Sequence, residues 1–243
     1  MKLLQDWKKY LIEFLMLFLA VFLGFIADSY RDKISEKSRE KEYIKALVED
    51  VKTDKVIISK VIQNNIARKS YLDELAKMCF NFNSDTTNMV KLYRHYPIVI
   101  TRPDFFVPNE LTMLQLKNAG GMRLIQSRKA IKAILKYDLQ KTLLVNQQKY
   151  YESYHNKAID VGLKIFNHQK LREMFDLYKT NDTLKLTTLS YELIRTDKET
   201  LTQFGNEVDM YGGIVDYYKI LLEKTNAEAD SLILTLKREY KME

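Results

Sequence analysis

The stretch LTQFGNEVDMYGGIVDYYKILLEKTNAEADSLILTL, residues 201–236, decides the fold class. Its apolar residues recur at intervals of three and four, the spacing of one face of an α-helix. Ten of the eleven register positions are hydrophobic: Leu201, Phe204, Val208, Tyr211, Val215, Tyr218, Leu222, Thr225, Ala229, Leu232 and Leu236. The register keeps its phase through Gly212 and Gly213, so both glycines are predicted to lie inside one helix. At 1.5 Å per residue, a helix of about 40 residues reaches on the order of 60 Å.

The last helix is predicted to start at Thr196-Asp-Lys-Glu199, which has the form of a capping box. Residues 128 to about 167 form another helix, with Ser127 as its N-cap. The apolar seam of its second half is Tyr151, Tyr154, Ala158, Val161 and Ile165. Between these helices, Asn181 and Asp182 mark a turn, and residues 184–194 remain open between strand and helix.

A first long helix is predicted to run from the N-terminal apolar stretch to Phe80, because residues 25–80 contain no proline and glycine is absent between Gly24 and Gly120. Its apolar register is Ile44, Leu47, Val51, Ile58, Val61, Leu72, Leu75 and Cys79. Asp54, Asn65 and Arg68 interrupt the same register. A stripe that drifts around a bundle helix explains these interruptions, and a coiled coil whose register they fix is the alternative.

Composition supports the helical prediction. The chain of 243 residues has 7 glycines and 3 prolines, too few for an all-β sandwich, a glycine-rich phosphate-binding fold or a low-complexity disordered chain. The single cysteine, Cys79, excludes an internal disulfide and a cysteine-based zinc cluster. The expected fold is all-α: an N-terminal transmembrane helix, then an elongated bundle of long helices with one short irregular or extended insert.

All three prolines fall in YPIVITRPDFFVP, residues 96–108, which marks the insert. Residues 98–101 remain open between strand and helix: Ile98, Val99 and Ile100 could form a short extended segment, but a single strand in a helical chain has little to pair with. Asn109 is expected to cap a short helix over 110–118 that Gly120 and Gly121 end. The insert is the candidate partner surface, formed by Pro97, Pro103, Phe105, Phe106 and Pro108.

Four consecutive segments follow from these boundaries. They are a tail and anchor over 1–28, a charged helix over 29–80, the proline-containing insert over 81–127, and a long-helix region over 128–243.

The anchor is LIEFLMLFLAVFLGFIA, residues 11–27, in which twelve of seventeen residues are Leu, Ile, Phe or Val and Glu13 is the single charge. On an insertion scale those twelve residues contribute about −5 kcal/mol. Trp7, Tyr10 and Tyr30 flank the stretch as interfacial aromatics do. A retained single-pass membrane anchor is therefore expected. A cleaved signal peptide fits less well, because small residues at the cleavage site are missing, and a buried soluble helix is the remaining alternative.

The side of the membrane is harder to predict. Five basic residues follow the span closely, and the positive-inside rule would keep the large domain in the cytoplasm. Lys2, Lys8 and Lys9 precede it as in a signal anchor, and long domains translocate regardless of charge. We expect a span in the inner (cytoplasmic) membrane and a periplasmic, extracytoplasmic large domain, with the opposite orientation as the alternative. Lys2, Lys8 and Lys9 are also expected to attract anionic lipid headgroups.

One face of the predicted span has an acidic residue at each end and two small residues near its middle. Its residues are Glu13, Leu17, Ala20, Gly24 and Asp28. Ala20 and Gly24 have the spacing that lets two membrane helices approach closely, which predicts a helix-packing face. The alternative is that Glu13 reaches the interface, Asp28 lies outside, and the two small residues have no role.

No catalytic, cofactor-binding or metal site is predicted. Glu152-x-x-His155 has the spacing of a di-iron motif, but neither His95 nor His168 completes a second copy, so a surface Glu–His pair is expected. His95 and His168 are expected beside exposed helix-end carbonyls. Cys79 is expected to be a buried small hydrophobe. The charge of +7 is spread along the chain, so no nucleic-acid interface is expected.

Two stretches carry a family resemblance: WKKYLIEFLMLFLAVFLGFIADSYRDKISEKSREKEYIKALVEDVKTD from Trp7, and NELTMLQLKNAGGMRLIQSRKAIKAILKYD from Asn109. They resemble a family of uncharacterised single-pass membrane proteins of Bacteroidota-type Gram-negative bacteria. The resemblance covers about 80 residues, implies an inner-membrane helical protein, and carries no activity.

The expected function is therefore that of a non-enzymatic scaffold or accessory subunit in an envelope assembly, with a protein partner or a second copy of the chain and no identified small-molecule substrate. The alternative is an extracytoplasmic ligand-sensing domain that signals through a membrane partner. An enzyme is the third hypothesis.

Overall fold

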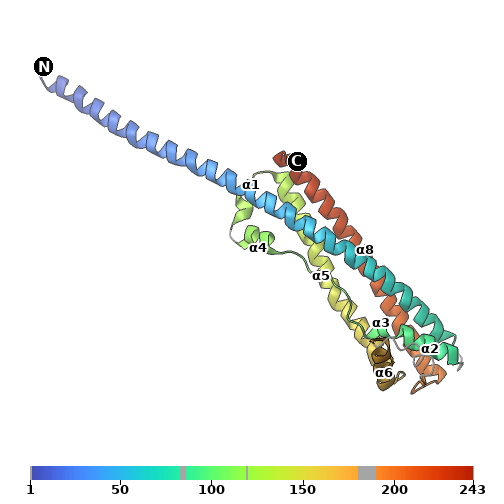
Figure 1. The fold of residues 1–243 in the computed structure, drawn as a ribbon. Helices are drawn as coiled ribbons and strands as arrows, with labels where there is room; N and C mark the ends of the chain where they lie inside the picture. The colour runs from blue at the N-terminus through green and yellow to red at the C-terminus, as the bar shows by residue number, and fades with distance from the viewer. Residues whose placement is uncertain (1, 83–85, 119, 180–189, 243) are drawn as a thin grey trace. The chain divides into compact units, whose positions relative to one another are not determined.

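The computed structural model describes residues 2–82, 86–118, 120–179 and 190–242. Regular secondary structure in these ranges is helical, and an isolated bridge between Phe166 and Leu193 is the sole β-type pairing described. The elements are α1 (Lys2–Phe80), α2 (Thr86–His95), α3 (Pro97–Ile100), α4 (Leu111–Asn118), the 3₁₀ turn η1 (Gly121–Leu124), α5 (Arg128–Gly162), α6 (His168–Lys179) and α8 (Lys198–Tyr240) (Figure 1). The all-α prediction is confirmed.

The chain forms two compact units. Unit 1 contains Met1–Asp50, Glu110–Ile131 and Thr235–Glu243, and unit 2 contains Val51–Asn109 and Lys132–Leu234. Each unit is thus assembled from separate pieces, whereas the sequence suggested four consecutive segments. The reason is that each of the three long helices contributes residues to both units.

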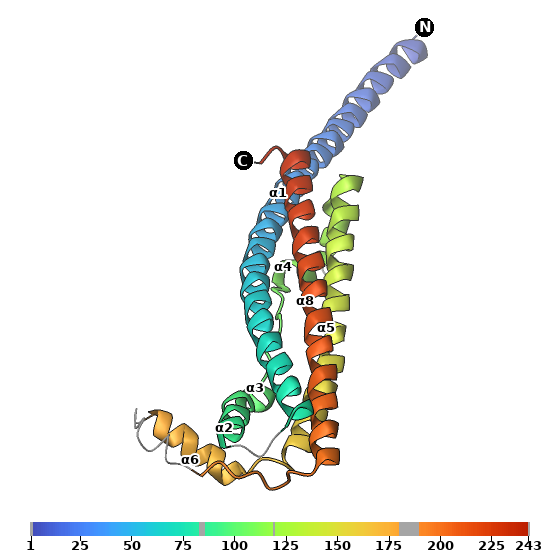
Figure 2. The same cartoon turned by 90° about the vertical axis from the view of Figure 1, so that its right-hand side faces the viewer.

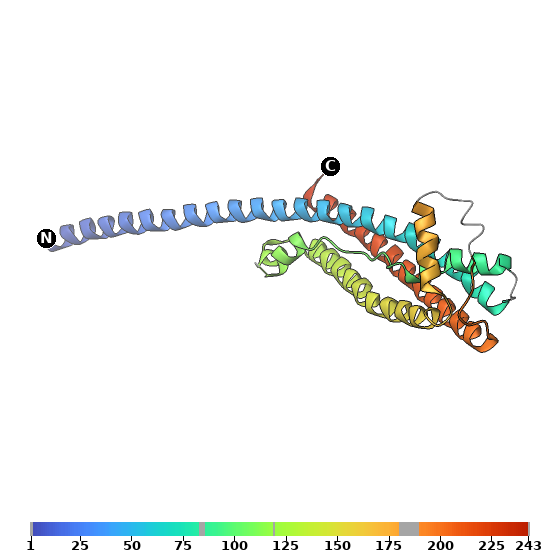
Figure 3. The same cartoon turned by 60° about the horizontal axis from the view of Figure 1, so that its bottom comes forward.

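Unit 2 is a three-helix bundle. Its parts of α1, α5 and α8 lie side by side, with α1 and α5 running in the same direction and α8 returning against them (Figures 1 and 2). The core is rich in aromatic side chains, and Tyr151, Tyr211 and Tyr218 in it are fully buried. α2 and α6 lie at the end of the bundle where α1 finishes (Figure 3).

The registers of α1 and α8 are the best-predicted features of the chain. All eleven α8 positions are buried, none more than 2% exposed, and α8 continues through Gly212 and Gly213 as predicted. On α1, Asp54, Asn65 and Arg68 are buried like the apolar residues around them. The interruptions are therefore built into the interior of the bundle. The prediction that the apolar stretch and the charged helix are one element is also confirmed.

Several predicted element ends are wrong by a few residues. α5 ends at Gly162, so Ile165 is buried beyond the helix. The residues over 97–100 form the helical turn α3, because Pro97 supplies a helical first position, so of the two alternatives for residues 98–100 the helical one is found. Residues 184–189 lie outside the described ranges, while 190–194 contain only the bridge at Leu193.

The caps were partly predicted. The Ser127 hydroxyl accepts a hydrogen bond from the Ala130 backbone N–H at 3.2 Å, which confirms that cap. For α8 the cap is Asp197, whose carboxylate accepts from the Thr200 N–H at 2.9 Å, so the Thr196 capping box is wrong by one residue. That hydrogen bond lowers the pKa of Asp197. Gly120, at φ 71°, provides the left-handed residue expected after α4.

Two glycines allow a matched test of packing. A Cβ at Gly162 would lie 2.5 Å from the Tyr96 ring, which is buried and stacked on Phe166, whereas a Cβ at Gly213 would meet nothing within 4 Å. We expect Gly162→Ala to lower the free energy of unfolding by about 1–3 kcal/mol through overpacking. Gly213→Ala should raise it by about 0.5–1 kcal/mol, since alanine favours a helix interior. Urea unfolding of both variants measures the difference, and equal effects would contradict this packing.

Candidate functional site

The N-terminal part of α1 exposes apolar side chains on every side. The large hydrophobic residues from Leu11 to Ile26 are between 40% and 69% exposed. This segment also contains the one helix window in the described chain that is long and apolar enough to cross a membrane, and none of it is buried. A helix that is apolar all round needs an apolar surrounding, which a bilayer or another protein supplies. The expectation of one candidate span is confirmed at this level.

The predicted helix-packing residues lie on one continuous helix and are exposed. They are Glu13, Leu17, Ala20, Gly24 and Asp28. A Cβ at Gly24 would meet nothing within 4 Å. Asp28 forms an ion pair with Arg31 at 2.6 Å, one turn further along. The face is therefore available for helix contact, and its use stays a prediction.

The candidate partner surface is only partly exposed. Pro103 and Phe106 are buried, while Pro97, Phe105 and Pro108 are half-buried. Phe105 contacts the Tyr151 ring edge-on at 5.1 Å between centroids. These five residues therefore belong largely to the bundle interior and do not form one outward patch. Val107, which sequence reasoning passed over, is 71% exposed.

The proline segment, residues 97–109, is held against the bundle by Arg68. One guanidinium nitrogen of Arg68 donates to the carbonyls of Ile98 at 2.6 Å and Thr101 at 3.1 Å, and the other donates to the carbonyl of Arg102 at 3.1 Å. The first nitrogen also lies 3.3 Å from the Tyr211 hydroxyl, which accepts its hydrogen bond. Among the described residues, no carboxylate lies within ion-pair distance of Arg68. The buried charge is thus stabilised by carbonyl and hydroxyl dipoles, and we call this arrangement the Arg68 clamp.

Further along, the segment is fixed at three points. The Tyr218 hydroxyl accepts from the Phe106 N–H at 3.0 Å, and the Gln148 side-chain amide donates to the Phe106 carbonyl at 2.8 Å. The carboxylate of buried Asp54 accepts from the Asn109 N–H at 2.7 Å and from the Tyr137 hydroxyl at 2.7 Å. An irregular segment leaves many backbone N–H and C=O groups without partners in the segment itself. Side chains of the bundle form hydrogen bonds with these groups instead.

Asn65 completes the polar interior. Its side-chain oxygen accepts from the Tyr151 hydroxyl at 2.9 Å, and its nitrogen donates to the Val61 carbonyl at 2.8 Å. Desolvation raises the pKa of the Tyr151, Tyr211 and Tyr218 hydroxyls, so all three remain protonated. Their rings meet edge to face, with Tyr151 5.5 Å from Tyr211 and 5.4 Å from Tyr218. The polar groups of this interior therefore act as hydrogen-bond partners that hold the bundle together.

His155 adjoins the same interior. It is 7% exposed, its ring lies 5.4 Å from that of Tyr211, and its Nε2 has no hydrogen-bond partner. Desolvation lowers its pKa below the ordinary value of 6.5, and the charge of Arg68 acts in the same direction. The expected surface Glu–His pair is wrong because Glu152 is exposed and His155 is buried.

A pH dependence of stability follows from His155. Between pH 6.5 and the lower pKa in the folded state, only the unfolded chain binds a proton at this imidazole. Stability should therefore fall as the pH falls below 6.5, by at most about 1.4 kcal/mol per pH unit. Denaturant unfolding at several pH values measures this slope. His155→Gln should remove it, while His95→Gln should leave it in place, and an unchanged slope in His155→Gln would contradict the assignment.

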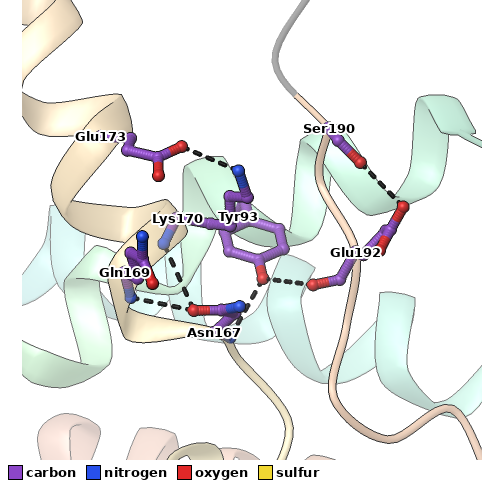
Figure 4. Close-up of polar contacts among 7 residues, drawn as sticks. All are labelled: Tyr93, Asn167, Gln169, Lys170, Glu173, Ser190 and Glu192. Atoms are coloured by element: carbon purple, nitrogen blue, oxygen red, sulfur yellow. Dashed lines mark hydrogen bonds and ion pairs between the residues drawn. The ribbon is translucent and has the colours of Figure 1, made fainter.

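A second polar cluster fastens α6 to α2 (Figure 4). The Tyr93 hydroxyl donates to the Glu192 carbonyl at 2.7 Å and accepts from the Asn167 N–H at 3.0 Å. The Asn167 side chain caps α6 by accepting from the N–H groups of Gln169 and Lys170. Lys170 and Ser190 each hydrogen-bond a neighbouring glutamate. The Tyr93 hydroxyl thus joins α2 to the residue before α6 and to the segment at Glu192.

The two other histidines and the single cysteine lie at helix ends or in the core. His95 ends α2 and contacts the Lys91 carbonyl at 2.8 Å, as predicted, whereas His168 begins α6, so the expected helix-end carbonyl role is wrong for it. Cys79 is 3% exposed, and desolvation raises the pKa of its thiol to about 12. No group of three or more His, Cys, Asp or Glu side chains in the described residues is placed to hold a metal ion.

The Arg68 clamp was missed by sequence reasoning, although a signal was present. Asp54, Asn65 and Arg68 occupy buried register positions, where a polar residue needs partners from outside the helix. Comparisons with family models, curated proteins and solved structures found no match to this chain.

Proposed function

We propose that this protein is a single-pass, membrane-anchored, non-enzymatic helical subunit that acts as a scaffold or accessory component of an envelope assembly. The observation that carries the proposal is the exposed apolar segment of α1. That segment is apolar on all sides, and the same helix continues without a break into the bundle register. An apolar segment of this length inserted in a bilayer would hold the folded bundle at the membrane.

The polar interior of unit 2 supports a structural role. Arg68, Asp54 and Asn65 direct their hydrogen bonds to the backbone or to tyrosines of the same unit. Cys79 is buried as an un-ionised thiol. The unusual side chains of this interior therefore serve to build one stable irregular segment against a bundle.

The proposed placement is the inner membrane, with the folded part outside the cytoplasm and a partner helix, or a second copy of the chain, on the Ala20–Gly24 face. Small residues four apart allow close approach of two helix backbones in a bilayer. This placement agrees with the resemblance to membrane-anchored proteins of Bacteroidota-type bacteria.

The experiment combines location with partner capture. The full chain, carrying a C-terminal reporter active only after export, is fractionated, crosslinked in membranes and purified in mild detergent. We expect a membrane-bound protein, an active reporter and a stoichiometric partner or crosslinked dimer. Ala20→Ile/Gly24→Ile should reduce the crosslinked species, whereas Phe18→Ile/Phe22→Ile on the opposite face should not. Recovery of a lone monomer would overturn the scaffold role, and an inactive reporter would overturn the orientation.

A further inference from the structure

Unit 1 contains a cavity of about 660 Å³ where α1 meets the end of α8. Lys41, Lys45, Ala46 and Glu49 line it from α1, and Tyr240, Lys241 and Met242 line it from the end of α8. Its volume falls within the range of small-molecule sites. A second cavity of about 370 Å³ shares Lys41, Tyr240 and Lys241 with it.

The lining carries an excess of positive charge. Lys41, Lys45 and Lys241 are exposed, and none of them lies within ion-pair distance of a carboxylate in the described part of unit 1. Glu49, the acidic residue on this lining, already has an interaction partner. Two lysines of α1 and one that directly follows α8 thus line one cavity without an ion-pair partner in the described residues.

Nearby acidic groups are already engaged. The carboxylate of buried Glu40 accepts from the Gln126 N–H at 2.8 Å and from the Tyr240 hydroxyl at 2.6 Å. Desolvation and this carboxylate raise the pKa of Tyr240, so its hydroxyl remains a donor. Glu239 pairs with Ser127 and Lys129.

The exposed carbonyls at the C-terminal end of α8 do not account for the position of Lys41 and Lys45 on α1. Lys237 and Arg238 already lie in the last turn of α8, where cations offset the exposed carbonyls. Lys41 and Lys45 come from the other helix and belong to the row Lys33, Lys37, Lys41 and Lys45, which share one face at intervals of four. Their convergence with Lys241 points to an anionic occupant.

We propose that this lysine-lined cavity binds a small organic phosphate or carboxylate. The ammonium groups would hold the anionic head by charge-assisted hydrogen bonds. Ala46, Met242 and the Tyr240 ring supply an apolar wall for a short attached hydrocarbon or aromatic part. The ligand class is therefore a compact anion with an apolar portion.

Distance along α1 favours a soluble anion over a lipid in the bilayer, a step that rests on the proposed anchor. Lys41 lies fourteen residues after Ala27, where the apolar stretch ends, so the helix places it about 21 Å further along its axis. The headgroup layer extends only about 5–7 Å beyond the hydrocarbon on each side. The headgroup layer would thus reach the level of Arg31, four residues after Ala27, but not the cavity.

The test uses the full-length protein in neutral-lipid nanodiscs with hexyl phosphate as the probe. Mass spectrometry after mild amine acylation reports which lysines the probe protects, and calorimetry reports the affinity. We expect saturable binding with protection of Lys41, Lys45 and Lys241. Lys41→Gln/Lys45→Gln/Lys241→Gln should weaken binding by at least about tenfold. The matched charge control Lys33→Gln/Lys132→Gln/Lys224→Gln should bind as the unmodified protein does.

Absence of saturable binding at millimolar probe, or undiminished binding by the cavity variant, would overturn the site. Nanodiscs with anionic lipid and no probe form the second arm. Protection of the three cavity lysines in that arm would overturn the choice of a soluble ligand. Release of the protein from membranes by alkaline carbonate would overturn the anchor alone, because probe binding and lysine protection can then be measured on the same full-length protein in solution without a bilayer.

Discussion

Replacing Arg68 by alanine should lower the free energy of unfolding by about 3–5 kcal/mol, a large effect for a single substitution. The change removes the donors that serve the carbonyls of Ile98, Thr101 and Arg102. Those carbonyls lie in α3 and in the two residues that follow it, and the Tyr211 hydroxyl loses a donor with them. Urea unfolding followed by circular dichroism gives the loss in stability.

Two further variants separate the clamp from simple loss of a basic residue. Arg68→Lys keeps the charge but cannot reach four acceptors in a planar arrangement, so it should recover only part of the stability. Arg102→Ala removes an exposed side chain while leaving the Arg102 carbonyl in place, and should change stability by less than about 0.5 kcal/mol. Hydrogen exchange at residues 98–102 should accelerate in Arg68→Ala beyond the change at α8. Uniform acceleration would contradict a local clamp.

Much of the helical architecture could be predicted because it depends on periodicity, which is local. The eleven apolar positions of α8 recur at three and four residues, and burial follows that spacing closely. Helix ends were predicted less well. Asp197 caps α8 one residue after Thr196 because several polar residues there can serve as caps, and only the chain geometry selects one.

The polar interior could not be predicted because its partners are distant in sequence. Arg68 was recognised as an interruption of a register, but the carbonyls it serves lie 30 to 34 residues away and Tyr211 lies 143 residues away. The clustering of prolines correctly located the irregular segment. It could not reveal that Pro103 and Phe106 turn inward, since an irregular segment has no periodicity from which to infer a buried face.

Introducing two arginines into the apolar segment, as Phe18→Arg/Phe22→Arg, should release the protein from the membrane. The apolar residues of 11–27 favour insertion by about −5 kcal/mol. The double change removes about 1 kcal/mol of that and adds about 6 kcal/mol of charge penalty near the bilayer centre, which brings the balance to about +2 kcal/mol. Both residues are exposed on α1, so neither substitution disturbs the bundle core. Carbonate extraction and sedimentation of membranes measure the partition.

The matched control, Ser35→Arg/Ser38→Arg, adds the same charge to exposed positions beyond the span and should remain in the pellet.

The mass of the purified unmodified chain distinguishes a retained anchor from a cleaved leader. A retained anchor requires residues 11–27 to be present in the membrane-bound protein, because no other described helix is long and apolar enough to hold it there. A mature chain that starts after Ala27 and stays in the supernatant when the membranes are sedimented would contradict the anchor. A membrane-bound Phe18→Arg/Phe22→Arg variant would instead show that protein contacts, and not the apolar segment, retain the bundle at the membrane.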